Sequence, residues 1–365
     1  NENGNNVTVS GIKAVQLMKK TTVEGDITPD KIQKAVKNYQ EVAKKYGSIY
    51  KDNIPQDVLN KKILPFQHII NRLENVYADP QTKTPVDLSK ISPGEAAENF
   101  YKKYTWQIKN RAIQPSAQKK ALALYEKVDK PFKFTYGFGS SDAGSYLIIL
   151  LFLLVFLCTF ITAPIFSAEY QTGADNILRC TKYGRTKLAV SKIISVVLIC
   201  GITSAVCISI FLLVENSVFG WESLKTSIQS VETICLPAIN VGQFEMITAA
   251  AGLLTLLATV SFTLFLSAKS RNTVNSMIIA IVFCLLPLIL SSISGSNAVN
   301  WLRMILPSGG VGLGNSFGIS LVELKFLTLG SYSFWSPYVM ITASAAAVPL
   351  FLILTVLSYC RHEVA

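Results

Sequence analysis

The stretch APIFSAEYQTGADNILRCTKYGRTKLAVSK, residues 163–192, separates two long apolar runs. The run at residues 146–166 contains no charged residue, and the run at residues 188–214 contains one, Lys192. Because a bilayer core of about 30 Å needs about 20 apolar helical residues, each run is long enough to cross a membrane. We therefore predict a short polar loop, residues 167–187, between two membrane-spanning helices.

Three more runs are long and apolar enough to span a bilayer, at residues 245–268, 274–293 and 337–360. The composition agrees, because 50% of the residues are hydrophobic and only 16% are charged, which is unusual for a soluble domain. The sequence thus predicts an all-α membrane protein with five visible spans. An odd number of spans places residues 1–140 and the C-terminus on opposite sides of the membrane.

The orientation follows from the basic residues in short loops, which concentrate on the cytoplasmic side. One side holds three, Lys225, Arg303 and Lys325, in the loops 215–244 and 294–336. The other side holds eight: Arg179, Lys182, Arg185, Lys187, Lys192, Lys269, Arg271 and Arg361. We expect the second side to be cytoplasmic, and residues 1–140 and the glycine-rich segment 294–336 to be extracellular. A cytoplasmic start of the chain would then require a sixth span before residue 1.

Residues 1–140 differ from the rest of the chain and are predicted to form a separate, mainly helical domain, followed by a transmembrane domain at residues 141–365. The first part holds 23 Lys or Arg against 14 Asp or Glu and no cysteine, which excludes a disulfide framework there. Helices are predicted at residues 28–46, at 56–77 with a break at Pro65, from Ser92 onward, and at 116–128, from capping residues and apolar spacing. The aromatic residues of PFKFTYGF, 131–138, are expected at the membrane interface.

No catalytic constellation or metal centre can be assigned. His68 and His362 are the only histidines, too few for a histidine metal site or a Ser-His-Asp triad. A G-x-x-x-x-G-K-[ST] phosphate loop does not occur in the sequence, so we expect no catalytic residue and no cofactor in this chain. Nothing resembles a sequence-reading nucleic-acid module. A stand-alone membrane enzyme is therefore not supported.

The polar loop itself is predicted to contain a short amphipathic helix at about residues 171–184, lying at the cytoplasmic surface with Ile177 and Leu178 opposite part of its charge. A simple anchor of basic residues would account for the charge. It would not account for the length of the loop or for its acidic, aromatic and glycine start.

The loop resembles the membrane subunits of ABC-2 type ABC exporters, found in many Gram-positive bacteria. The resemblance rests on Glu169-Tyr170-Gln171-Thr172-Gly173 after Ala163-Pro164, then on Arg179, Tyr183-Gly184-Arg185 and Lys187; it covers about residues 141–365. It implies a type V exporter-like helix bundle in the bacterial cell membrane. It also implies that the loop is a coupling helix, with Glu169 helping to set the gate. The coupling residues would be Glu169, Tyr170, Gly173, Ile177, Leu178, Arg179, Lys182, Tyr183, Arg185 and Lys187.

The resemblance further implies partners: an ABC ATPase subunit that holds ATP and Mg²⁺, a second permease subunit, identical or related, and the lipid bilayer. The domain 1–140 would be an insertion between the first and second spans of the family. The spans are nearly free of charge, which disfavours ion coupling and favours an apolar or amphiphilic cargo such as a peptide, an antibiotic or a lipid.

The segment LPSGGVGLGNSFG, residues 306–318, has glycines at a four-residue spacing. On a helix, Gly310, Gly314 and Gly318 would form a flat face for close packing, although Pro307 could break or start that helix. By resemblance the segment matches short extracellular helices that close an outer gate; an ordinary surface loop is the alternative.

A second function also fits the sequence. The large basic domain could be the ligand-binding part of a peptide-sensing or immunity-type receptor that moves no cargo.

Overall fold

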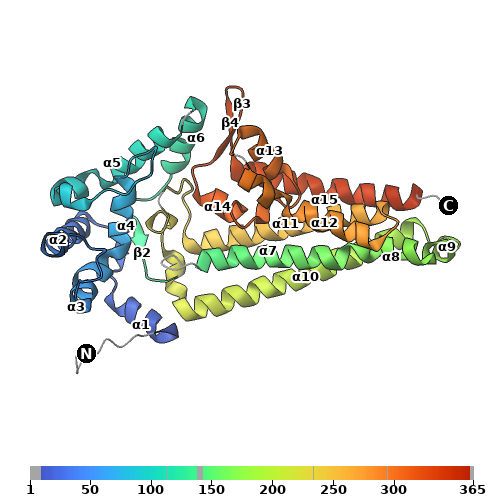
Figure 1. The fold of residues 1–365 in the computed structure, drawn as a ribbon, viewed down its shortest axis with the longest axis horizontal. Helices are drawn as coiled ribbons and strands as arrows, with labels where there is room; N and C mark the ends of the chain where they lie inside the picture. Colours follow the sequence, from blue (N-terminus) through green and yellow to red (C-terminus); the bar gives the residue numbers. More distant parts are fainter. Residues whose placement is uncertain (1–9, 113, 138–142, 233, 294, 362–365) are drawn as a thin grey trace. The chain divides into compact units, whose positions relative to one another are not determined.

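In the computed structural model most of the chain is α-helical (Figure 1). The structure describes residues 10–112, 114–137, 143–232, 234–293 and 295–361. The chain divides into two compact units: unit 1 comprises residues 1–144, 213–245 and 322–324, and unit 2 comprises residues 145–212, 246–321 and 325–365. The predicted domain boundary between residues 140 and 141 lies outside the described residues.

Unit 1 is built from short helices and one two-stranded ribbon. Its helices are α1 (Gly11–Thr21), α2 (Pro29–Tyr46), α3 (Gln56–Val58), α4 (Gln67–Val76), α5 (Pro93–Arg111) and α6 (Pro115–Tyr125). A π-helical turn at Leu59–Ile63 and a 3₁₀ turn at Leu64–Phe66 connect α3 to α4, and further 3₁₀ turns lie at Leu88–Lys90, Trp221–Lys225 and Ile228–Ser230. Strands β1 (Gly25–Asp26) and β2 (Lys133–Phe134) pair antiparallel.

Local signals in the sequence explain where these helices begin and end. Helix α2 starts after Thr28 with a proline at its first position and ends at Gly47, whose φ of 84° suits glycine. At the start of α5, the amide of Glu95 donates to the Ser92 hydroxyl at 3.2 Å. The predicted break near Pro65 is present, because the chain leaves the α-helical path between residues 59 and 66.

The aromatic segment 131–138 was expected at the membrane interface, and for its described phenylalanines this is wrong. The side chains of Phe132 and Phe134 are 0% and 2% exposed, in the core of unit 1. Phe132 makes an edge-to-face contact with Tyr101 at 4.9 Å between ring centroids. Pairing of β2 with β1 fixes the segment inside unit 1, and burial of an aromatic ring there removes more apolar surface from water than an interfacial position would.

The segment 213–245 also belongs to unit 1, which the sequence did not indicate. The Tyr104 hydroxyl donates to the Gln229 carbonyl at 3.3 Å, and the Ser227 amide donates to the Lys133 carbonyl at 2.9 Å. Unit 1 therefore includes a segment far along the chain. Residues 1–140 without this segment would lack some of the packing contacts of unit 1.

Unit 2 is dominated by long apolar helices. They are α7 (Ala143–Thr162), α10 (Thr186–Phe219), α11 (Val241–Lys269), α12 (Thr273–Ile293) and α15 (Ser336–Arg361). Two short helices, α8 (Pro164–Thr172) and α9 (Ala174–Arg179), lie between α7 and α10 in the sequence. The C-terminal end of α10 and the N-terminal end of α11 belong to unit 1. The described residues contain five helices that could cross a membrane: 144–172, 186–219, 241–269, 273–293 and 336–361. The predicted all-α class with five spans is thus confirmed.

Between α12 and α15 the chain folds back among the long helices. This part contains α13 (Asn297–Ile305), a 3₁₀ turn at Gly309–Val311, α14 (Phe317–Val322) and a hairpin of β3 (Phe326–Leu329) and β4 (Tyr332–Trp335). Thr259 donates to the Pro307 carbonyl at 3.1 Å, and Ser308 donates to the carbonyl of Phe283 at 3.0 Å. Because Thr259 and Phe283 lie near the middle of α11 and α12, the turn at Pro307 reaches well between the ends of these helices.

The continuous helical face suggested by the glycine spacing does not form. Gly310 lies in the 3₁₀ turn and Gly318 in α14, while Gly314 lies in the non-helical link between them. A Cβ on Gly310 would be 2.3 Å from the Thr255 hydroxyl and one on Gly318 would be 3.0 Å from Thr248, whereas nothing lies within 4 Å of one on Gly314. Of these three glycines, only Gly310 and Gly318 are therefore positions of close packing.

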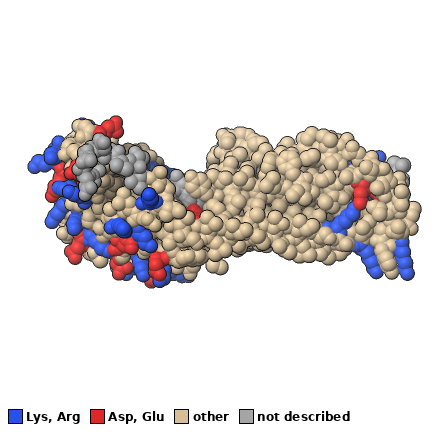
Figure 2. Space-filling view, turned by 90° about the horizontal axis from the view of Figure 1, so that it is seen from below, with Lys and Arg blue, Asp and Glu red and all other residues tan. Residues whose placement is uncertain are grey.

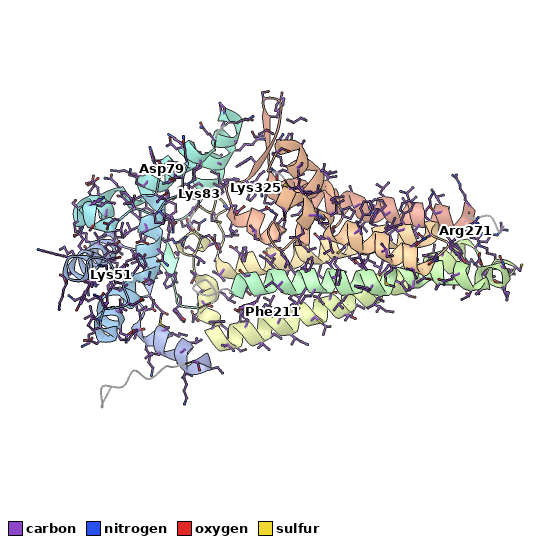
Figure 3. All side chains as sticks on the ribbon, viewed as in Figure 1. Lys51, Asp79, Lys83, Phe211, Arg271 and Lys325 are labelled. Carbon is purple, nitrogen blue, oxygen red and sulfur yellow. The ribbon has the colours of Figure 1, made fainter. Side chains whose placement is uncertain are left out.

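Charged side chains gather on unit 1 and at one end of unit 2, and the remaining visible surface of unit 2 is nearly free of charge (Figure 2). Figure 3 places Lys51, Asp79 and Lys83 on unit 1, and Arg271 at the same end of unit 2 as α8 and α9. Phe211 lies on the long helix α10. An apolar surface over long helices is what lipid requires.

Candidate functional site

The polar stretch begins at a break in the first long helix, at Ala163–Pro164, where α7 ends and α8 begins. Proline cannot donate the regular helical hydrogen bond, so nearby backbone groups need other partners. Ser267 on α11 accepts hydrogen bonds from the amides of residues 166 and 167, at 3.0 and 3.1 Å. Ser276 on α12 donates to the Ala163 carbonyl at 2.9 Å. The break is thus anchored to two other long helices.

The predicted helix at 171–184 is wrong in its bounds. Helix α8 runs through Thr172, Gly173 adopts a left-handed conformation with φ of 70°, and the six-residue helix α9 ends at Arg179. Glycine is favoured at such a position because it has no Cβ to clash with the backbone. The polar stretch is therefore a helix, a sharp turn, a second short helix and a series of turns, rather than one rod.

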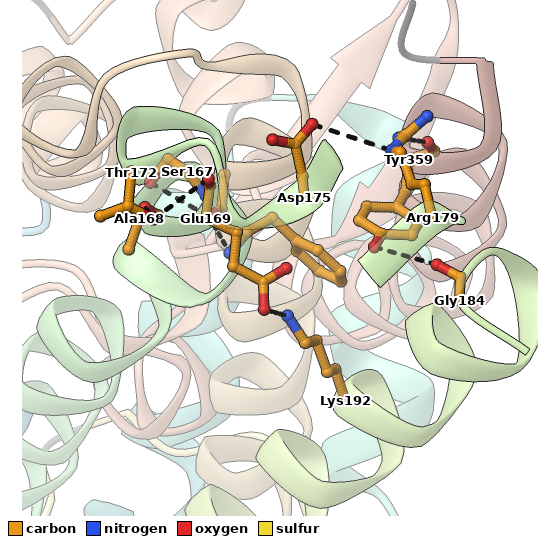
Figure 4. Close-up of polar contacts among 11 residues, drawn as sticks. Ser167, Ala168, Glu169, Thr172, Asp175, Arg179, Gly184, Lys192 and Tyr359 are labelled. Atoms are coloured by element: carbon orange, nitrogen blue, oxygen red, sulfur yellow. Dashed lines mark hydrogen bonds and ion pairs between the residues drawn. The ribbon is translucent and has the colours of Figure 1, made fainter. Parts of the chain in front are cut away.

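A buried ion pair holds the second short helix in place (Figure 4). Asp175 and Arg179 lie one helical turn apart, with 3.8 Å between Oδ2 and Nε, and both side chains are 7% exposed. The Arg179 guanidinium also lies over the ring of Tyr359 on α15, 4.8 Å from its centroid, and donates to the Tyr359 carbonyl. Helix α9 is thereby tied to the end of the last long helix.

A second ion pair connects α8 to α10 (Figure 4). Glu169 pairs with Lys192, and their side chains are 20% and 19% exposed. The Lys192 ammonium also lies 5.3 Å from the ring centroid of Phe166. Because both partners are largely withdrawn from water, salt screens this pair less than a surface pair.

The turns after α9 pack closely around Gly184. A Cβ on Gly184 would lie 1.6 Å from the carbonyl oxygen of Leu178, so no side chain fits there. The Tyr359 hydroxyl donates to the Gly184 carbonyl at 3.3 Å. Tyr359 therefore contacts this loop at two points, through Arg179 and through Gly184.

The outer side of the loop is exposed and mixed in character. Ile177 is 75% exposed and Tyr183 is 54% exposed, while Lys182, Arg185 and Lys187 are also exposed. The Lys187 ammonium lies 4.0 Å from the centroid of the Tyr183 ring. An exposed apolar side chain and an exposed aromatic ring with a cation beside it are suited to binding another protein.

Nine of the ten residues singled out from the sequence fall into two groups, and Leu178 belongs to neither. Glu169, Tyr170, Gly173 and Arg179 shape and anchor the loop; the Tyr170 hydroxyl, for example, donates to the Ala268 carbonyl at 3.4 Å. Leu178 is half-buried and does not share the exposure of Ile177. The outward group is Ile177, Lys182, Tyr183, Arg185 and Lys187.

Three residues of the site were missed by the sequence analysis: Asp175, Ser267 and Tyr359. The four-residue spacing of Asp175 and Arg179 could have suggested an ion pair on a helix. Ser267 and Tyr359 gave no signal, because they lie about 100 and 180 residues from their partners in the chain.

Among the described residues, no group of three or more His, Cys, Asp or Glu side chains could hold a metal ion. The groups assembled at the loop are ion pairs, hydrogen bonds and an exposed apolar tip. This arrangement can bind another protein through the exposed tip. It can also transmit a displacement of the loop to the helices that the loop contacts.

Five long apolar helices and a structured polar loop at one end define a multi-pass, all-α membrane protein. The chain belongs to the ABC-2 family of transporter proteins, whose family model, described as ABC-2 family transporter protein, matches residues 5–357. Neither a curated protein nor a solved structure matches the chain significantly. Family membership makes the chain the membrane subunit of an ABC transporter, and it implies an ABC ATPase subunit as partner. The match includes residues 5–140, which the sequence resemblance had left uncovered.

Proposed function

We propose that this permease subunit belongs to an ATP-driven exporter of a bacterial cell, Gram-positive by resemblance, and that the loop 167–187 is its docking element for the ATPase. The cargo would be apolar or amphiphilic, such as a peptide, an antibiotic or a lipid, because the apolar spans carry few charges. ATP and Mg²⁺ would be bound by the partner, and a second permease subunit would complete the path.

The observation that carries the proposal is the exposed tip of the loop. Ile177 projects with 75% exposure from a helix whose other side is fixed by the Asp175–Arg179 pair. An exposed apolar anchor is the type of feature that concentrates binding energy in a partner's groove. The same loop also exposes Lys182, Arg185 and Lys187, and these cations would favour encounter with an acidic rim.

The contacts behind the tip supply a route for movement. Tyr359 links the loop to α15, and the Glu169–Lys192 pair links α8 to α10. Ser267 and Ser276 hold the break at Ala163 against α11 and α12. A displacement of α9 by an ATPase would therefore act on the ends of four long helices, which is the repacking that switching of a transport path requires.

The orientation belongs to the same proposal. The loop and the C-terminal end of α15 would be cytoplasmic, in keeping with the positive-inside rule, and residues 1–140 would be extracellular. In this orientation the tightly packed Gly318, next to Thr248, would lie towards the extracellular side of the path and would contribute to an outer gate. The turn at Pro307 and Gly310 would lie deeper, near the middle of α11 and α12, and Gly314 does not share this close packing.

The proposal can be tested with one substitution and a matched control. Ile177→Asp should abolish cargo-stimulated ATP hydrolysis and transport in membranes that also contain the ATPase, because a charge replaces the apolar anchor. Ile12→Asp, at an isoleucine of unit 1 that is 59% exposed, should leave both unchanged. Normal ATPase binding and transport by the Ile177 variant, at wild-type amounts in the membrane, would rule out the docking role.

Ligand sensing by unit 1 is a second candidate function, favoured by a cavity with polar walls in that unit. Deleting residues 10–130 would remove the packing partners of residues 213–245. Point substitutions in the cavity are therefore the sharper test.

A further inference from the structure

A cavity of about 200 Å³ lies within unit 1, between α1, the turn at Leu64–Phe66, α4, β2 and residues 230–231. Its apolar wall includes Met18, Leu64 and Phe134, and its polar wall includes Thr22, His68 and Arg72. The volume is below the range of about 300–1,000 Å³ usual for drug-sized ligands. It equals the share of about six or seven water molecules in the liquid, which suits one small organic group.

Two buried polar atoms on this wall have no hydrogen-bond partner among the described residues: Nδ1 of His68 and Oγ1 of Thr22. The His68 ring is held in a fixed orientation by stacking on Phe134, with 3.8 Å between centroids and 7° between planes. Burial of a polar group without a partner is unfavourable. Both atoms therefore have hydrogen-bonding capacity to offer a ligand in this small cavity.

The electrostatic environment indicates the sign of the ligand. Burial, followed by the cations of Lys31 and Arg72, lowers the pKa of His68 to about 3. The imidazole is thus neutral at physiological pH, with one ring nitrogen as donor and the other as acceptor. None of the residues that line the cavity is acidic.

Arg72 is the charged group on the cavity wall. It also interacts electrostatically with Glu232. A guanidinium has five donors in a planar fork, so one edge can remain bound to its present partners while another receives a ligand.

We propose that this cavity binds a small organic carboxylate with an apolar substituent, about the size of one capped amino-acid residue. The carboxylate would pair with the Arg72 guanidinium, the group best matched to its geometry, and would accept a hydrogen bond from His68 or Thr22. The apolar substituent would lie against Met18, Leu64 and Phe134. The terminal residue of a peptide has this chemistry. The site is independent of the proposed coupling to an ATPase.

The test uses the full chain in lipid nanodiscs and two probes of the same shape, N-acetyl-leucine and its neutral amide, N-acetyl-leucinamide. Calorimetry measures their affinities. Because the chain has only two histidines, a His362→Gln background leaves His68 as a single imidazole signal in NMR spectra. We expect the carboxylate to bind about tenfold more tightly than the amide and to shift the His68 signal.

Matched variants separate the site from general charge attraction. Arg72→Gln should remove the preference for the carboxylate, whereas Lys44→Gln, which removes one charge from an exposed position on α2, should leave it unchanged. Arg72→Lys keeps the charge and should keep part of the preference if Arg72→Gln unfolds unit 1. Equal binding of the two probes, binding that leaves the His68 signal unmoved, or no binding at millimolar concentration would each overturn the proposal. The assay contains no ATPase, so failure of the export proposal would not affect its result.

Discussion

Replacement of Arg179 by methionine tests the buried cluster that holds α9 against α15. The Asp175 and Arg179 charges are 3.8 Å apart with 7% exposure each, so their attraction is about 4 kcal/mol at an effective dielectric constant of 20. Desolvation of both groups offsets part of this attraction. The variant leaves the Asp175 carboxylate buried without its cation and also removes the contacts of the guanidinium with Tyr359.

We expect Arg179→Met to lower the local stability of residues 174–185 by about 3–5 kcal/mol, the usual cost of breaking a buried pair. The double variant Asp175→Asn with Arg179→Met should be less destabilised than the sum of the two single variants, because the second change removes the uncompensated charge. Membrane insertion should be unaffected, since the long helices keep their apolar surfaces.

Hydrogen exchange measured by mass spectrometry on the full chain in nanodiscs reports this local stability. A loss of 3 kcal/mol or more should speed exchange of the α9 amides at least about 100-fold. Lys182→Met is the control, because it removes a charge from an exposed position of the same loop. If Arg179→Met accelerates exchange no more than Lys182→Met does, the buried pair does not stabilise the loop and the reasoning fails.

Three further predictions concern other contacts. Gly184→Ala should distort the turn and release the Tyr359 hydroxyl, detected as faster exchange of the turn amides, because a Cβ there would lie 1.6 Å from a carbonyl oxygen. Ser267→Ala should lower thermal stability by about 1–3 kcal/mol, since two buried amide donors lose their acceptor; Ser270→Ala, just after α11, should cost less. The pKa of His68 is lowered to about 3 in the folded chain, so as the pH falls the unfolded chain takes up this proton before the folded chain does. The free energy of unfolding should therefore fall by about 1.4 kcal/mol for each pH unit between about 6.5 and 3. His68→Phe keeps the stack on Phe134 and should be less acid-sensitive than the wild type in thermal melts; equal sensitivity would contradict the assignment.

The contacts of Tyr359 give the loop its mechanical role in the proposed function. One aromatic residue at the end of α15 receives the Arg179 guanidinium on its face and donates its hydroxyl to Gly184. The loop therefore cannot move far without moving α15 or breaking these contacts. A loop that served only as a positive anchor would need neither contact.

The sequence by itself determined the long helices and many short ones. Apolar runs of 20 or more residues have no stable alternative to a membrane span, so the five spans could be predicted to within a few residues. The limits of α2 were equally readable, since Pro29 at the first helical position and Gly47 in a left-handed conformation act on the backbone beside them. The polar loop between the first two spans was also recognisable from its composition.

Only the tertiary structure decided which of those residues meet. The sequence could not show that the predicted helix 171–184 is interrupted at Gly173. This residue has a left-handed conformation in the structure, but a glycine can adopt a helical or a left-handed conformation. Burial of Phe132 and Phe134 depended on the pairing of β2 with β1, and the roles of Ser267 and Tyr359 depended on contacts across about 100 and 180 residues. Such contacts are selected by the packing of whole helices, which no local pattern of residues encodes.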